Sequence, residues 1–455
     1  MKLNRHLLGR IIFTVSLLLT PFAVHAESNP AGGIKHQEDV LSLEKAISIA
    51  LSDSTIIHEA LSKYNAALEE KKSAFANFLP KVSYSYSYSR FDDQPYTKFG
   101  TTKIPVSSKD YCYWDFTVAQ PIFTGYALYT KHQMAKLMID LKEVEKRLAI
   151  LDVTKSVKTA YFNILVAKKF LIVAEETIEN LEAHLRDAEK FFKYGVIPYN
   201  DLLQSRVALA NAVQHWEKAK SNLEMAVSTL NTHLRMDVNR PTRVVEVTEV
   251  FPSAYSLEQL TAAALQNRPE LKALSIALQN ADYAIRLAKS SYYPEVALIG
   301  NYEQMGDNMA ASSNDYGNDH NASVTLQAKW LFFEWGKTGA EVKKYFHEKT
   351  SVQEQLKRVE DGVSLEVKNA FLNQEVAKKN IKTAEESLGQ AKENFRLTNL
   401  QYREQMATTS DVLEARTILS QAQTNYYSAL YGYLISEAEL ERVVGGNLGT
   451  DLTAR

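Results

Sequence analysis

Hydrophobic residues recur at heptad spacing along two very long stretches of the chain. Between Gly125 and Gly195 lie 69 residues without glycine or proline, and apolar positions there alternate between spacings of four and three. These positions form a seam, meaning a row of apolar residues along one side of a helix. The seam of the first stretch contains Leu137, Leu141, Val144, Leu148 and Leu151. The seam of the second stretch contains Ile381, Ala384, Leu388, Ala391, Phe395, Thr398 and Tyr402. Seams of this kind pack as coiled coils, and a helix of this length would extend roughly 100 Å.

Four shorter segments follow a different rule, in which apolar and polar residues alternate. Residues 82–90 read VSYSYSYSR, so one face of a strand carries Val82 and three tyrosines, and the other face carries only serines. The remaining segments are YCYWDFTVAQ (111–120), EVALIGNYE (295–303) and NASVTLQAKW (321–330). Alternation over about ten residues is typical of strands in a transmembrane β-barrel, although a half-buried sheet in a soluble domain also alternates.

The two kinds of pattern occur in the same order in each half of the chain. SLEKAISIAL (42–51) returns as SLEQLTAAAL (256–265), and FLPKV (78–82) returns as YYPEV (292–296), both 214 residues later. VKTAYFNILVAKK (157–169) and NDLLQSR (200–206) return 210 residues later as VKNAFLNQEVAKK and SDVLEAR. A nearly constant offset indicates a duplicated architecture.

We therefore predict two structural repeats. The first, 27–240, contains a helix, a strand hairpin at 81–122, a long helix at 124–194 and a helix at 199–235. The second, 241–445, contains helices within 256–293, a strand hairpin at 294–333, a long helix at 336–404 and a helix at 410–442, followed by a tail at 446–455.

The N-terminal residues predict export from the cytoplasm. Lys2, Arg5 and Arg10 precede an apolar run from Ile11 to Val24, and Val24-His25-Ala26 has small residues where a signal peptidase cleaves. We expect residues 1–26 to be a cleavable signal peptide, since the run is short for a membrane anchor. The single cysteine, Cys112, cannot form an internal disulfide, so another kind of interaction must stabilise the exported chain.

Four strands cannot close a barrel by themselves. An open strand edge is not tolerated in lipid, and a barrel needs about eight strands or more, so the barrel interpretation requires several copies of the chain. The serines of 83–89 would then line a water-filled lumen, and Tyr84, Tyr86 and Tyr88 would meet lipid or its interface. The alternative is a periplasmic coiled-coil adaptor or structural protein without lipid-facing strands.

The repeated motifs resemble those of TolC-like outer-membrane efflux proteins. The resemblance rests on the paired SLEKAISIAL and SLEQLTAAALQNRPEL motifs, the FLP and YYP junctions, QPIFTG (120–125) and SDVLEAR (410–416), and it covers roughly residues 40 to 445. It implies a mainly helical fold with a homotrimer that closes a twelve-stranded outer-membrane barrel above a helical periplasmic tunnel. It also implies a passive exit duct for drug efflux or type I secretion, with a periplasmic adaptor and an inner-membrane pump or ABC transporter as partners.

The resemblance also assigns roles to residues near the two breaks between long helices. The breaks would form the adaptor-docking tip, which includes Gly195, Val196, Pro198, Gln405, Ala407 and Thr408. Gln405 stands where the family usually has a glycine. Tyr402 and Asp201 match a hydrogen-bonded pair that holds the entrance shut. Asn200 matches the acceptor of a second link, whose arginine is replaced here by Ala407.

Asp411 and Glu414 match acidic residues that form rings at the periplasmic aperture of the family's channels. Six carboxylates in one trimer would favour cations over anions at a narrow mouth. The residues alone also predict a local role, with Asp411 as the helix N-cap and Glu414 three positions later completing a capping box.

No other chemistry has support in the sequence. The histidines show no close metal-ligand spacing, and no nucleophile elbow, phosphate-binding loop or dinucleotide glycine pattern occurs. The net charge is only −2 at pH 7, and no basic run suggests binding to nucleic acid. We expect a protein that is not an enzyme and that uses no cofactor and no metal.

Overall fold

A computed structural model describes residues 40–247 and 255–446. The predicted signal peptide (1–26) and all but the first residue of the predicted tail (446–455) lie outside the described residues.

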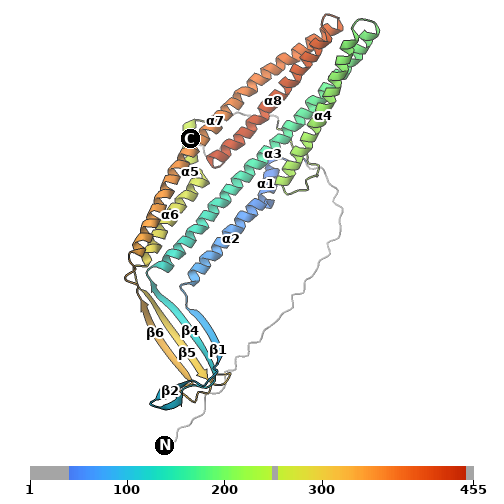
Figure 1. The fold of residues 1–455 in the computed structure, drawn as a ribbon. Coiled ribbons are helices and arrows are strands. Elements are labelled where there is room, and N and C mark those ends of the chain that lie inside the picture. The colour runs from blue at the N-terminus through green and yellow to red at the C-terminus, as the bar shows by residue number, and fades with distance from the viewer. Residues whose placement is uncertain (1–39, 248–254, 447–455) are drawn as a thin grey trace. The chain divides into compact units, whose positions relative to one another are not determined.

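The elements follow the same order twice along the chain (Figure 1). The first half contains α1 (Leu43–Asp53), α2 (Thr55–Ala76), β1 (Lys81–Arg90), β2 (Tyr96–Phe99), β3 (Thr102–Pro105), β4 (Asp110–Thr124), α3 (Ala127–Lys193) and α4 (Tyr199–His233). The second half contains α5 (Leu257–Asn267), α6 (Pro269–Ser290), β5 (Glu295–Gly306), β6 (His320–Lys329), α7 (Lys337–Arg403) and α8 (Thr409–Val444).

The helices α3 and α7 dominate the fold, with 67 residues each. At 1.5 Å per residue each is about 100 Å long. Helix α4 folds back along α3, α8 folds back along α7, and α3 and α8 lie side by side (Figure 1). Among the described residues, no helix combines the length and the apolar character that crossing a membrane would require.

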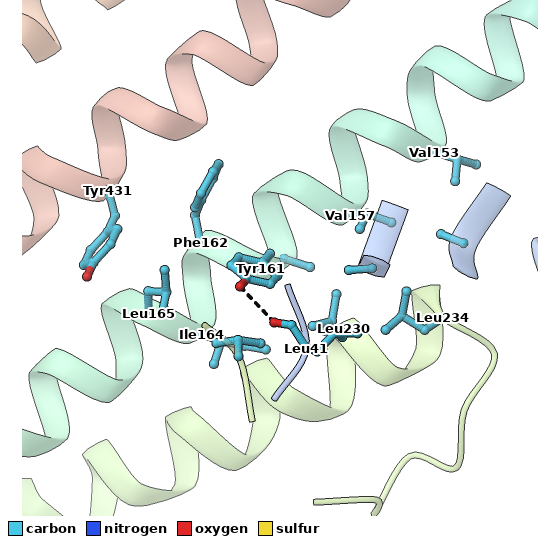
Figure 2. Packing of buried hydrophobic residues seen from close by; sticks show 14 of the residues in the cluster. Leu41, Val153, Val157, Tyr161, Phe162, Ile164, Leu165, Leu230, Leu234 and Tyr431 are labelled. Atoms are coloured by element: carbon cyan, nitrogen blue, oxygen red, sulfur yellow. Dashed lines mark hydrogen bonds between the residues drawn. The ribbon is translucent and has the colours of Figure 1, made fainter. Parts of the chain in front are cut away.

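The largest apolar core lies where α1, α3, α4 and α8 meet (Figure 2). Tyr161 on α3 is completely buried there, and its hydroxyl is hydrogen-bonded to the carbonyl oxygens of Leu41 at 3.0 Å and Val245 at 2.8 Å. Leu41 and Val244 form a parallel bridge beside this site. Burial raises the pKa of Tyr161 to about 12, so the hydroxyl remains a donor that anchors the start of both repeats to the long helix.

The four long strands form one antiparallel sheet in the order β1-β4-β5-β6, at one end of the long helices (Figure 1). The register places Tyr84 opposite Phe116, Phe116 opposite Tyr302, and Tyr302 opposite Ala322. The apolar positions of all four strands therefore share one face, where Trp114 lies 5.9 Å from Tyr84 and 5.5 Å from Tyr302 between ring centroids. The predicted alternation is coherent across the whole sheet.

The opposite face of the sheet carries a hydrogen-bonded polar network. Ser85 donates to Asp115, Tyr113 donates to Glu303 at 2.9 Å, and Asn321 donates to Glu303 at 3.1 Å. Thr117 donates to Asn301 at 2.8 Å. Closely spaced carboxylates and amides must be hydrogen-bonded to water or to one another. This face therefore suits a water-filled lumen and not lipid.

The predicted fold class, mainly helical with four strands per chain, is confirmed, and the structure adds two details. The predicted first helix is divided at Ser54 into α1 and α2, just as Arg268 and Pro269 separate α5 from α6. The polar loop expected between the first two long strands contains a small hairpin, β2–β3, which turns at Gly100 with φ of 62°. Both details depend on local turn chemistry that the longer periodic patterns do not contain.

Candidate functional site

Two turns between long helices form the predicted tip. The first joins α3 to α4, at the end of the helices away from the sheet (Figure 1). Helix α3 ends at Lys193, and Gly195 takes a left-handed conformation with φ of 74°. The amide of Val196 donates to Phe191 O at 2.8 Å, and the amide of Gly195 donates to Phe192 O at 2.9 Å. This hydrogen-bond pair is a Schellman cap, and Pro198 then precedes α4 in an extended conformation.

The second turn, between α7 and α8, has the same backbone geometry without a glycine. Gln405 takes the left-handed conformation with φ of 60°, and the amide of Met406 donates to Gln401 O at 2.8 Å. The departure from the family's usual glycine therefore leaves the cap intact, at a steric cost of about 1 kcal/mol. Ala407 is half-buried behind this turn, whereas Met406, Thr408 and the first turn's Val196 are exposed.

The two turns contact each other through side chains. Arg403 Nε lies 3.5 Å from Asp187 Oδ2, and Ser410 Oγ donates to Gln204 Oε1 at 3.3 Å. The rings of Tyr402 and Phe191 lie 5.4 Å apart. These contacts join the helix ends that flank the two turns, so both turns lie at the same end of the bundle.

Tyr402 is buried to 2% exposure between α3 and α7. Its ring centroid lies 4.7 Å from that of His184, and its hydroxyl accepts a hydrogen bond from Thr409 Oγ1 at 3.4 Å. Burial raises the pKa of Tyr402, so the phenol stays neutral.

The predicted hydrogen bond between Tyr402 and Asp201 is not present in the described chain. The Tyr402 hydroxyl instead contacts Thr409, which follows the turn of its own helical hairpin. Asp201 remains half-buried in the first turn of α4, and its charge contributes to raising the pKa of Tyr402. The neighbouring Asn200 is exposed.

Asp411 caps helix α8, but the predicted capping box is wrong by three residues. Thr408 is the N-cap, and Asp411 accepts from the Thr408 amide and from Thr408 Oγ1, both at 2.8 Å. Asp411 N returns a hydrogen bond to Thr408 Oγ1 at 3.2 Å. The backbone bond from Thr408 lowers the pKa of Asp411, so this exposed carboxylate is held ionised, and Glu414 is exposed one turn further along α8.

Two polar residues near this end of the bundle are buried although no local sequence pattern indicates it. His184 on α3 is 4% exposed and Arg416 on α8 is 3% exposed. Their burial depends on which helices pack together, and the sequence pattern does not indicate this. Arg206, which occupies the position of Arg416 in the first repeat, is exposed. The part of the chain that the structure describes contains no group of three histidine, cysteine or acidic residues able to hold a metal ion.

The sequence matches the family described as "Outer membrane efflux protein" over residues 46–234 and 260–446. The outer membrane protein TolC of Escherichia coli K12 is 22% identical over 314 residues, which cover 65% of this chain and 62% of that protein. The alkaline protease secretion protein AprF of Pseudomonas aeruginosa is 21% identical over 419 residues, or 89% of this chain and 84% of AprF.

A solved structure has the same fold. The CmeC outer membrane channel of Campylobacter jejuni superimposes with a TM-score of 0.76 at 18% identity, over 89% of this chain and 85% of CmeC.

The two family segments coincide with the two halves of the observed architecture, each containing helices on both sides of a strand pair. A periplasmic adaptor without long strands, the alternative function, does not fit this match. The chain belongs to the outer membrane efflux protein family and is a protein of the outer membrane that extends into the periplasm.

Proposed function

We propose that this protein is the outer-membrane exit duct of a tripartite efflux or type I secretion system. The single observation that carries the proposal is the two-faced sheet attached to helices about 100 Å long. Its polar face suits water and its aromatic face suits lipid, while α3, α4, α7 and α8 are long enough to extend deep into the periplasm. The duct is passive, and an inner-membrane pump or ABC transporter supplies the energy.

The duct needs three copies of the chain. Every residue of β1 and of β6 is exposed in the single chain, and neither strand has a described partner on its outer edge. Because open edges are not tolerated in lipid, the edges must pair between copies, and three copies supply the twelve strands expected from the family resemblance. The matching family is named for efflux and the relative AprF for protease secretion, so drug efflux and protein secretion both stay open as the cargo class.

The tip is the proposed entrance and docking surface. Gly195, Val196, Pro198, Gln405, Ala407 and Thr408 would receive a periplasmic adaptor. Tyr402, Asp201 and Asn200 would take part in holding the entrance closed. Asp411 and Glu414 would supply six carboxylates around the mouth of a trimer and thereby favour cations.

Planar-bilayer recordings of the purified full chain test this proposal. The variant Asp411→Asn with Glu414→Gln keeps side-chain size and most of the cap, which alanine at 411 would remove. We expect a small cation-selective conductance whose reversal potential moves toward the nonselective value in this variant. The matched control, Glu385→Gln with Glu386→Gln on the exposed face of α7, should leave selectivity unchanged.

Two results would contradict the proposal. Protein that is soluble without detergent and forms no channel would exclude a duct. A channel with equal selectivity in the tip and control variants would keep the duct but remove the proposed role of Asp411 and Glu414.

A further inference from the structure

A long groove runs along α3 between α4 and α8. Its volume is about 820 Å³, within the range of pockets that hold small organic ligands. Val166, Phe170 and Val173 of α3 form an apolar floor, and the walls come from residues 208–226 of α4 and 413–424 of α8.

Arg416 lies in this groove as a buried cation without a carboxylate partner. Its side chain donates to Thr177 Oγ1 at 2.6 Å and lies over the Phe395 ring at 5.6 Å, while its Nε atom is buried without a hydrogen bond. Among the described residues its guanidinium donates to a hydroxyl and not to a carboxylate. Glu176, the acidic group that acts on it electrostatically, accepts a hydrogen bond from Gln423 at 2.7 Å. Burying a charge without a partner of opposite charge is unfavourable in free energy, so an anion bound at this guanidinium would stabilise it.

The other polar groups that line the groove are a lysine, a histidine and neutral amides and hydroxyls. Lys218 and His215 lie on the α4 wall, and Asn163, Asn211 and Asn222 add amides that can donate. No acidic residue lines the groove, although acidic residues outnumber basic ones in the chain as a whole. The charges therefore complement an anion.

The dimensions of the groove decide what kind of anion fits. The α3 floor from Asn163 to Leu181 is about 27 Å long. An extended alkyl or fused-ring molecule can lie along this floor with its head at Arg416.

We propose that this groove binds an amphiphilic organic anion, with a carboxylate or sulfonate head at Arg416 and an apolar body along Val166, Phe170 and Val173. This site is separate from the aperture residues and does not depend on the proposed duct function. A planar carboxylate can accept two hydrogen bonds from a guanidinium, which makes it a suitable head group at Arg416.

Binding of dansyl-labelled undecanoate to the full chain in lipid nanodiscs tests the site, with empty nanodiscs subtracted as background. We expect saturable binding that the methyl ester of the probe does not reproduce. Arg416→Gln should weaken binding at least tenfold, because it removes a charge-assisted hydrogen bond pair. Arg206→Gln is the matched control, since Arg206 occupies the same position of the first repeat but is exposed and lies 3.3 Å from Glu189. It should leave binding unchanged.

Two further variants keep the test decisive if Arg416→Gln does not fold. Lys218→Gln alters only an exposed cation of the groove and should weaken binding a few-fold. Ala174→Phe fills the floor while leaving Arg416 in place and should abolish binding. Equal binding of the ester and the acid, or unchanged affinity in both Lys218→Gln and Ala174→Phe, would overturn the proposal.

Discussion

His184 is the residue whose surroundings most directly predict a response to pH. Neither of its ring nitrogens has a hydrogen-bond partner, and it packs against Tyr402 next to the turns of the tip. Burial lowers the pKa of His184, opposed by the nearby Asp187. The unfolded chain therefore binds a proton near the ordinary histidine pKa of about 6.5, while the folded chain does so only at lower pH.

The sign of this linkage predicts weaker packing at the tip in acid. The contribution of neutral His184 is present above about pH 6.5 and is lost as the pH falls, because the unfolded state then binds more protons. We expect acidification from pH 7 to pH 5 to lower the melting temperature and to lower the amide-exchange protection factors of residues 180–190 and 398–406, each rate being compared with the intrinsic rate at the same pH. His184→Leu should reduce both changes.

The control for this measurement is His347→Leu, which alters an exposed histidine on α7. Its pH response should match that of the unaltered protein. An equal pH response in the His184→Leu variant would show that other groups cause the acid sensitivity.

At the scale of elements, a partly buried ion network connects the kink between α5 and α6 to three other helices. Arg268 is 3% exposed, lies 3.3 Å from Glu270 and forms an ion pair with Glu366 of α7. Arg442 of α8 lies 3.2 Å from Glu270, 3.4 Å from Glu366 and 2.9 Å from Asp152 of α3. The network fixes the position of the second repeat's first helices on the long helices.

Replacement of Arg268 by methionine should be strongly destabilising. The change removes charged hydrogen bonds to Glu270 and Glu366, which Arg442 still contacts, and should cost about 1.5–3 kcal/mol. Denaturant unfolding of the two variants can measure the loss against Arg396→Met. Arg396 forms an exposed pair with Glu393 at 2.8 Å, and its loss should cost less than about 1 kcal/mol. Similar values for both variants would contradict a structural role for the network.

The sequence predicts elements whose signal is periodic and misses those that depend on distant contacts. The Gly- and Pro-free stretch after Gly125 corresponds to α3, and the alternation of Tyr84, Tyr86 and Tyr88 corresponds to a strand face. The partners of Arg268 and Arg442 lie up to 290 residues away, so no local pattern reveals them. The position of the cap at Thr408 was missed for a different reason, because both Thr408 and Asp411 are good N-cap residues.

At the scale of the whole molecule, the duplication predicts how copies join. The end of β4 pairs with β5, and there Gly125 and Tyr126 both have positive φ and Phe123 packs on Tyr293 at 6.3 Å. The equivalent residues after β6, Trp335 and Gly336, have the same backbone conformation. Phe333, the equivalent of Phe123, is 61% exposed, and Leu79, the equivalent of Tyr293, is 49% exposed. The β6 edge therefore exposes the counterpart of Phe123, and the β1 edge exposes the counterpart of Tyr293. Two copies can join these edges through the same contact that β4 and β5 make.

The observed register of β4 with β5 predicts which residues of β6 and β1 pair between two copies. Thr117 of β4 lies opposite Asn301 of β5, and offsets of 210 and 214 residues translate that pair into Gln327 of one copy and Ser87 of the next. Both belong to the polar face, and the neighbouring pair from Phe116 and Tyr302, Leu326 and Tyr88, belongs to the apolar face. The alternation therefore stays in phase across the junction, as a closed barrel requires.

Disulfide crosslinking can test this register in the background Cys112→Ala, which removes the only native thiol. Gln327→Cys with Ser87→Cys should yield a covalent trimer, because three junctions close the ring. Within one copy these residues lie on opposite edges of a four-stranded sheet and at different levels along it, more than about 14 Å apart, so they cannot bridge internally. Gln327→Cys with Ser85→Cys, two residues out of register on the same face, is the matched control. Preferential crosslinking of the control pair would contradict the register, and ladders longer than three copies would indicate an open assembly instead of a closed trimer.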